Sequence, residues 1–180
     1  KAARKSGSLL TGGSTCRYSP DITAAKEEIV SGNSIGSLRS AQLSFVGDFD
    51  NPYGGAVFYG SHLIEIALEL FGNEVIKVSS LRSQRSLTTI LTYENFEVTL
   101  SLTEGIAKTP MLLLGDKGCY YREMDISKVY SFGLQAFIKM LRTEKLPIEL
   151  EDLLIPVRLF NKAEELQNQF REYQEDDVKI

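Results

Sequence analysis

Apolar residues recur along this chain with two periods, one typical of helices and one typical of strands. Between Ser19-Pro20-Asp21 and Gly32 they follow helical spacing. The serine can cap the first backbone N–H groups, the proline fits the first turn, and the aspartate suits the positive end of the helix dipole. These features predict a helix that ends at the glycine, and the alternation from Leu38 to Val46 predicts a strand after it.

A longer, apolar helix is predicted between the glycine pair Gly54-Gly55 and Gly72. Its apolar residues form one stripe and its two acids another, namely Leu63, Ile66, Ala67, Leu70 and Phe71 against Glu65 and Glu69. The composition of residues 48–55 indicates a loop that leads into this helix.

A series of short strands rich in β-branched residues follows this helix. The predicted strands are Glu74–Ser80, Leu87–Tyr93, Phe96–Thr103, Met111–Leu114 and Gly118–Arg122. Two helices, Tyr130–Arg142 and Glu149–Tyr173, complete the pattern, and Pro156 should kink or delimit the second. Strands clustered in this way predict an α+β fold, with a predominantly antiparallel open sheet and helices packed on one face.

The start of the chain differs from the rest. Lys1–Ser6 has the composition of the end of a helix, and Gly7–Gly13 is a short apolar segment between glycines that predicts one strand. Nothing in the sequence caps the opening helix, and the predicted strand has no hairpin partner nearby. We therefore expect residues 1–13 to belong to another unit and residues 14–180 to form one α+β domain.

Composition excludes several classes of protein. Hydrophobic residues make up 43% of 180 residues, which suits one compact domain. The net charge of −4 argues against a nucleic-acid partner, and no apolar run reaches the roughly 18 residues of a membrane span. Two cysteines without motif spacing and one histidine are too few for a disulfide framework or a metal site. We therefore expect a cytoplasmic protein without a bound metal.

The acidic excess is confined to one end of the sequence. Residues 141–180 hold six Lys or Arg and ten Asp or Glu, which accounts for the whole net charge of −4. This is typical of the solvated face of a final helix.

His62 is the only histidine of the chain. No G-x-G-x-x-G, P-loop, G-x-S-x-G or H-E-x-x-H motif is present. Gly60, two residues earlier, would let a ligand or another backbone approach closely. An imidazole near a helix N-terminus stays neutral and can accept a proton, whereas the alternative is an ordinary half-buried histidine with one satisfied hydrogen bond.

The segment from Gly54 to Gly72 resembles the signature of the glucose–fructose oxidoreductase / inositol dehydrogenase / rhizopine-catabolism family. That signature is a glycine pair, an apolar run, D-x-G-x-H, and an apolar helix with an acid three residues on, ending in glycine. The matching residues are Gly54, Gly55, Gly60, His62, Glu65 and Gly72. Similar flanking segments are Arg17-Tyr18-x-Pro20, Gly32-x-x-Ile35-Gly36, Phe137-Ile138, Leu146-Pro147 and Glu151-Asp152. The resemblance covers nearly the whole chain.

The resemblance implies the C-terminal, substrate-side domain of a two-domain oxidoreductase that acts on a sugar- or polyol-like substrate. A Rossmann domain would hold NAD or NADP in the full-length protein, and residues 1–13 would be the end of that domain. This chain alone would bind neither nucleotide and would be inactive, because it lacks the phosphate-binding glycine turn. The family's Glu-Lys-Pro lysine, which lies between the domains, is absent from this sequence.

The resemblance makes His62 the catalytic acid–base residue and Arg17, Tyr18 and Tyr59 the candidates for substrate binding. One departure from the family pattern concerns Phe58, which occupies the position of the family aspartate. A phenyl ring cannot orient or ionise an imidazole, so the usual sugar-alcohol mechanism is in doubt. Tyr59 could supply a hydroxyl instead, or be a buried structural tyrosine.

The sequence allows two interpretations of Arg17, substrate binding or a structural salt bridge. Its guanidinium offers a fixed fork of donors for a substrate carboxylate or hydroxyls. Alternatively it forms a salt bridge with Asp21 or Glu28 at the edge of the domain.

In two of the predicted strands we expect apolar residues on both alternating sets of positions, and so on both faces of the sheet. These residues are Leu100 with Leu102 and the run Met111–Leu114. Because helices cover only one face of the sheet, we expect the open face to pack on a second copy and form a homodimer, as in similar proteins. The alternative to an enzyme is a non-catalytic ligand-binding or dimerisation module that kept this fold. A G-x-G-x-x-G and a Glu-Lys-Pro encoded upstream of Lys1 would favour the enzyme.

Overall fold

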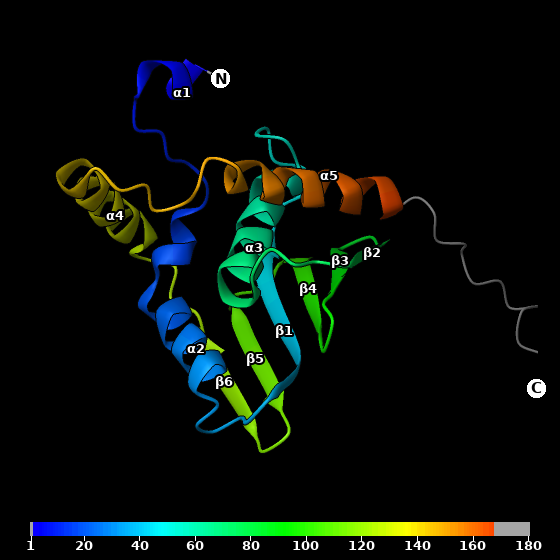
Figure 1. Ribbon diagram of the computed structural model, residues 1–180. Coiled ribbons are helices and arrows are strands. Elements are labelled where there is room, and N and C mark those ends of the chain that lie inside the picture. The colour runs from blue at the N-terminus through cyan, green and yellow to red at the C-terminus, as the bar shows by residue number, and fades with distance from the viewer. Residues whose placement is uncertain (1, 168–180) are drawn as a thin grey trace, which may run out of the picture.

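The computed structural model describes residues 2–167, so the predicted helical residues 168–173 lie outside the described part of the chain. Within that part, the helices are α1 (Ala2–Ser6), η1 (Thr15–Tyr18), α2 (Pro20–Ser31), α3 (Ala56–Phe71), α4 (Val129–Thr143), η2 (Asp152–Leu154) and α5 (Ile155–Gln167). The strands are β1 (Leu38–Gly47), β2 (Lys77–Arg82), β3 (Ser86–Thr92), β4 (Glu97–Glu104), β5 (Pro110–Gly115) and β6 (Cys119–Glu123). Figure 1 shows their arrangement.

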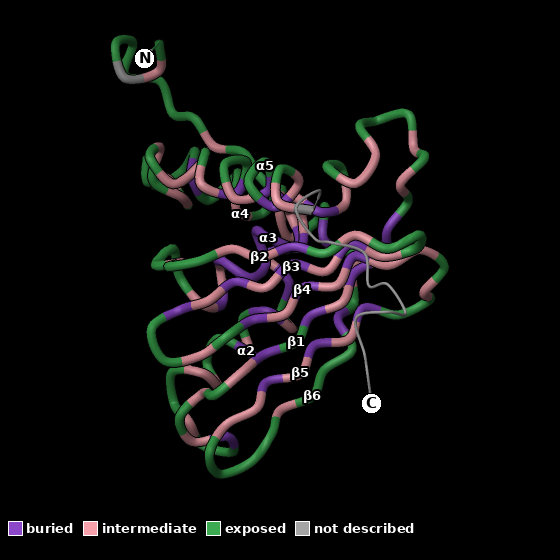
Figure 2. Tube along the Cα trace, turned by 90° about the vertical axis from the view of Figure 1, so that its right-hand side faces the viewer, coloured by how far each residue is buried: buried purple, intermediate pink, exposed green. Residues whose placement is uncertain are grey.

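The six strands form one sheet in the order β2-β3-β4-β1-β5-β6. Only the pair β1 and β4 is parallel, with Leu43 opposite Leu100 and Phe45 opposite Leu102, and all other pairs are antiparallel. Figure 2 shows the strands stacked in this order, with burial alternating along them. The predicted α+β class and predominantly antiparallel open sheet are confirmed.

Helices cover one face of this sheet. Helix α3 packs on β1 and β4, α5 packs on β2 and on α3, and α2 packs on α3. The buried apolar side chains of the strands and of α3 form a single core. Each fully buried Leu or Ile in it contributes about 1.5–3 kcal/mol relative to exposure, which is why α3, apolar almost all round, lies at the centre of the domain.

Local signals set the helix ends. Ser19 caps α2, its Oγ accepting from the Asp21 N–H at 3.3 Å, and Gly32 ends the helix in the left-handed conformation at φ 60°. Pro156 lies in the first turn of α5, after η2, where a missing N–H leaves no hydrogen bond unmade.

Two expectations are wrong. Residues 7–13 contain no strand, because no neighbouring strand pairs with them. Leu100 and Leu102 do not lie on opposite alternations but share the helix-covered face, where both are buried. On the open face, β5 presents half-buried Leu112 and Leu114, while β1, β3 and β4 present mainly Ser and Thr.

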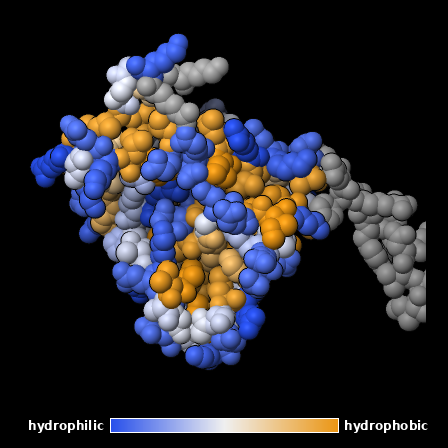
Figure 3. Space-filling view, viewed as in Figure 1, coloured by the Kyte–Doolittle hydropathy of each residue, from blue (hydrophilic) through white to orange (hydrophobic). Residues whose placement is uncertain are grey.

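Helix α4 stands apart from the sheet and packs mainly on η1. It exposes a stripe of large apolar side chains, Tyr130, Leu134, Phe137, Ile138 and Leu141. Figure 3 shows apolar surface over this helix.

Candidate functional site

The His62 region of α3 is packed from both sides. Gly60 is buried and faces α5, where a Cβ atom would come within 2.1 Å of the Phe160 ring. The glycine therefore admits a neighbouring aromatic side chain, which corrects the expectation that it lets a ligand or another backbone approach. His62 itself lies in the second turn of α3 rather than at its N-terminal end.

The His62 ring is half-buried among two aromatic rings and one hydroxyl. Its centroid lies 6.1 Å from that of Phe45 on β1 and 5.8 Å from that of Phe58, one turn earlier in α3. Its Nδ1 lies 2.8 Å from Oγ of Ser14. Burial lowers the pKa of His62, because desolvation disfavours the charged imidazolium.

The second ring nitrogen, Nε2, is available for chemistry. Among the described residues it has no hydrogen-bond partner, and it is not one of their enclosed, unpaired polar atoms. The Ser14 hydroxyl can donate to Nδ1 or accept from it, so Nε2 can carry either a proton or a lone pair. The arrangement suits a neutral imidazole that gives or takes one proton.

Ser14 is held in place by Glu65. The Glu65 Oε2 accepts from the Ser14 backbone N–H at 2.6 Å, although the two residues are 51 positions apart. Both residues are buried, with 3% of Ser14 and 7% of Glu65 exposed. Burial raises the pKa of the Glu65 carboxyl, against the opposing effects of the Ser14 N–H and Arg17.

These two residues were missed as site residues in the sequence. Glu65 was placed on a polar stripe of its helix, and helical spacing shows which residues share a face but not what covers that face. The one sequence signal was the acid of the family signature, which Glu65 matches. The close approach of Gly13, where a Cβ would come within 2.3 Å of the Glu65 carboxylate, shows only in the structure.

Arg17 turns toward the acids of α3. Its Nη1 lies 4.0 Å from Glu65 Oε2 and its Nε lies 3.6 Å from Glu69 Oε2, while Lys26 pairs with the other Glu69 oxygen at 2.6 Å. The salt bridge that the sequence allowed therefore exists, but with other partners. Asp21 instead pairs with Arg122 at 2.8 Å, and Glu28 accepts from backbone N–H groups of residues 34 and 35.

The structure joins His62 to Arg17 through Ser14 and Glu65, but it places the two tyrosines differently. Tyr59 is half-buried, packs against the core, and meets the Phe58 ring edge-on at 5.0 Å. Tyr18 is half-buried and, with residues of α4 and of the chain that follows it, lines a cavity of about 620 Å³. Burial raises the pKa of Tyr18.

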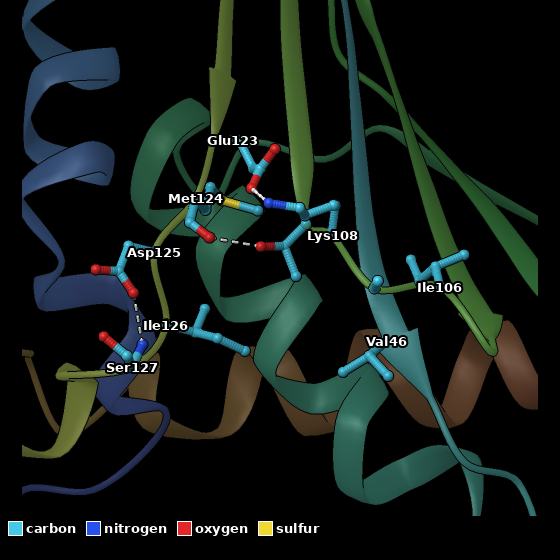
Figure 4. Close-up of a pocket in the computed structure, with 10 residues that line it drawn as sticks. Val46, Ile106, Lys108, Glu123, Met124, Asp125, Ile126 and Ser127 are labelled. Atoms are coloured by element: carbon cyan, nitrogen blue, oxygen red, sulfur yellow. Dashed lines mark hydrogen bonds and ion pairs between the residues drawn. The ribbon is translucent and has the colours of Figure 1, made fainter.

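A further cavity of about 460 Å³ lies where β1, the β4–β5 connection and the end of β6 meet. Figure 4 shows that the polar groups of this cavity bind to one another: Lys108 pairs with Glu123, and Asp125 accepts from the Ser127 N–H. The Thr109 hydroxyl donates to the Met124 carbonyl. Val46 and Ile126 supply apolar lining. Because Lys108 and Glu123 form an ion pair and Asp125 accepts a backbone N–H, we assign no catalytic role to this cavity.

Neither a metal site nor a membrane span is found in the described part of the chain. Among residues 2–167, no group of three His, Cys, Asp or Glu side chains is placed to hold a metal ion. No helix there is both long enough and apolar enough to cross a bilayer.

No protein-family model matches the sequence, and no curated protein sequence matches it. Solved structures do match the fold. A protein from Sinorhizobium meliloti assigned as a myo-inositol dehydrogenase has a TM-score of 0.78 at 16% identity, over 94% of this chain and 66% of that chain. An oxidoreductase from Agrobacterium radiobacter, in complex with NAD+, L-tartaric acid and magnesium, has a TM-score of 0.74 at 16% identity, over 93% and 65%.

A third match is the aldose–aldose oxidoreductase from Caulobacter crescentus in complex with glycerol. It has a TM-score of 0.71 at 15% identity, over 94% of this chain and 65% of that chain. This chain therefore spans just under two thirds of the length of these structures. The resemblance found in the sequence is confirmed at the level of fold: the chain has the α+β architecture of the C-terminal domains of these inositol dehydrogenase-type oxidoreductases.

Proposed function

We propose that this chain is the substrate-binding and dimerisation domain of an oxidoreductase that uses NAD or NADP and acts on a sugar- or polyol-like substrate. The fold shared with oxidoreductases whose names include inositol and aldose substrates supports this class. The observation that carries the proposal is the His62 imidazole, held at Nδ1 by Ser14, kept neutral by burial, and free at Nε2.

The cofactor, when bound, accepts or supplies the hydride. No residue of this chain is assigned to hold it, because the sequence lacks the glycine turn that binds a dinucleotide. His62 handles the proton. During oxidation of an alcohol, Nε2 takes the hydroxyl proton as the carbon loses its hydride, and in the reverse direction Nε2 returns a proton to the carbonyl oxygen.

The departure at Phe58 is accommodated in this scheme by Ser14. A carboxylate beside Nδ1 would favour the charged imidazolium, whereas a hydroxyl orients the ring without adding charge. The site is therefore expected to work with a neutral histidine. Substrate contacts from Arg17, Tyr18 and Tyr59 stay predictions. The Arg17 guanidinium already forms ion pairs with Glu65 and Glu69 of α3.

The test is His62→Ala in the full-length protein, assayed with NAD+ and NADP+ against sugars and polyols. Turnover should fall by about two to four orders of magnitude, the usual contribution of a positioned acid–base group. The free energy of unfolding should change little, since the ring is only half-buried. Near-normal turnover would remove His62 from the mechanism.

The alternative is the non-catalytic module with the same fold. It predicts that the full-length protein oxidises and reduces none of these substrates with either nucleotide. The exchange of the family aspartate for Phe58 is the observation that favours it.

A further inference from the structure

A series of hydrogen bonds leads from a buried carboxylate to the only imidazole of this chain. Glu65 does not bond to the His62 ring. It accepts from the Ser14 backbone N–H at 2.6 Å, and Ser14 Oγ in turn lies 2.8 Å from His62 Nδ1. The same Oγ accepts from the Cys16 N–H at 3.2 Å, which fixes the direction of the hydroxyl oxygen.

Glu65 has little freedom to move. Its carboxylate lies so close to Gly13 that a Cβ there would overlap it, and Arg17 faces it from η1 at 4.0 Å. One face of α3 thus fixes the backbone at Ser14. Residues 7–13 form no strand or helix, so among the described residues Ser14 is held only by capping η1, through the Cys16 N–H, and by Glu65.

We propose that Glu65 is a positioning residue: by binding the Ser14 backbone to α3, it places the Ser14 hydroxyl against Nδ1 and so aims Nε2 of His62 outward. The catalytic meaning of this arrangement rests on the proposed function, but the arrangement itself is a property of this chain. In the family pattern an aspartate stands where this chain has Phe58. The proposal assigns the positioning of His62 to a different carboxylate, that of Glu65.

The charged groups in this cluster lie on three elements. Arg17 is on η1, Glu65 and Glu69 are on α3, and Lys26 on α2 pairs with Glu69. From β1, the Phe45 ring faces the imidazole. Loss of the Glu65 charge alone would disfavour the imidazolium and so lower the His62 pKa or leave it unchanged. Loss of positioning would let the ring turn into water, and the pKa would rise toward its ordinary value of about 6.5. The two effects have opposite signs.

The experiment is an NMR titration of His62 in this chain, where a single histidine makes the signal unambiguous. Ser14→Ala and Glu65→Ala should both raise the His62 pKa relative to the unsubstituted chain and weaken NOE contacts between its ring and Phe45. Glu65→Gln should not raise the His62 pKa and should keep the NOE contacts, since the amide oxygen can still accept from the Ser14 N–H. Glu28→Ala is the matched control, because Glu28 also accepts backbone N–H groups, at 2.7 and 3.1 Å, but at the far end of α2.

A second variant covers the case in which Glu65→Ala does not fold. Gly13→Ala keeps every charge but forces the Ser14 segment and the Glu65 carboxylate apart, so it should also raise the His62 pKa. A folded Glu65→Ala or Gly13→Ala chain with unchanged His62 pKa and NOE contacts would overturn the proposal.

Turnover of the full-length protein separates this inference from the proposed function. Glu65→Ala should lower kcat by about 10- to 100-fold, the range found for residues that orient metal-binding histidines, with Glu65→Gln recovering much of it. If the titration of this chain shifts as expected but the full-length protein has no oxidoreductase activity, the positioning role of Glu65 is supported and the proposed enzymatic function is refuted.

Discussion

A hydroxyl beside an imidazole and a carboxylate beside an imidazole have different consequences for proton transfer. A carboxylate fixes Nδ1 as a donor and raises the pKa of the ring. Ser14 can donate or accept, and the Phe45 and Phe58 rings lie beside the half-buried imidazole. His62 is therefore built to stay neutral at pH 7, which suits an acid–base group that must work in both directions of a reversible hydride transfer.

The lowered pKa of His62 also predicts how stability depends on pH. Burial holds the folded-state pKa below the unfolded value of about 6.5, so between the two values the unfolded chain binds more protons. Stability should therefore fall as the pH drops from about 7 toward 5. Urea denaturation of the wild type and of His62→Gln at each pH isolates this contribution, because Glu65, whose raised pKa acts in the opposite sense, is present in both.

The wild type should lose more of its free energy of unfolding than His62→Gln over this range. Parallel curves for the two proteins would show that the folded-state pKa of His62 is not depressed.

At the scale of elements, the most demanding contact is the crossing of α3 and α5 at Gly60. The Phe160 ring occupies the space that a Cβ at Gly60 would need. Alanine improves helix propensity by about 1 kcal/mol over glycine, but overpacking a core commonly costs about 1–3 kcal/mol. We therefore expect Gly60→Ala to lower the free energy of unfolding, with α5 displaced from α3.

A double-mutant cycle checks this contact. In a Phe160→Leu background the Gly60→Ala substitution should cost less, because the smaller side chain leaves room for the methyl group. Gly12→Ala is the control, since a Cβ there meets nothing within 4 Å and the backbone is not left-handed. Additive effects of Gly60→Ala and Phe160→Leu would contradict the packing argument.

The elements themselves could be predicted from the sequence because their signals are local. Ser19, Gly32 and Gly72 mark helix ends through backbone geometry that neighbouring residues determine. The parallel pairing of β1 with β4 could not be predicted, because it joins strands separated by a helix and a hairpin. The Ser14–Glu65 hydrogen bond could not be predicted for the same reason, because its two residues are 51 positions apart in the sequence. His62 was found because it is unique, but its orienting partner lies 48 positions away.

At the scale of the whole molecule, the open face of the sheet decides how copies could associate. Antiparallel sheets can leave one face in water, and the Ser and Thr of β1, β3 and β4 are compatible with that. Leu112 and Leu114 on β5, with Tyr121 opposite Leu112 on β6 and 62% exposed, form an apolar strip on the same face. Helices α2, α3 and α5 all pack on the other face, so nothing in the described chain covers this strip.

We expect this face to form a twofold contact with a second copy, because a broad, regular surface with an apolar strip is self-complementary across a dyad. The chain should sediment as a dimer at about tens of micromolar, and Leu112→Glu should shift it toward monomer by burying two like charges at the dyad. Val30→Glu is the matched control, since Val30 is 81% exposed on α2, away from this face. A wild-type chain that sediments as a monomer would show that the strip is solvated. A Val30→Glu chain that dissociates as readily as Leu112→Glu would show that association uses another surface. The first candidate for that surface is the exposed apolar stripe of α4.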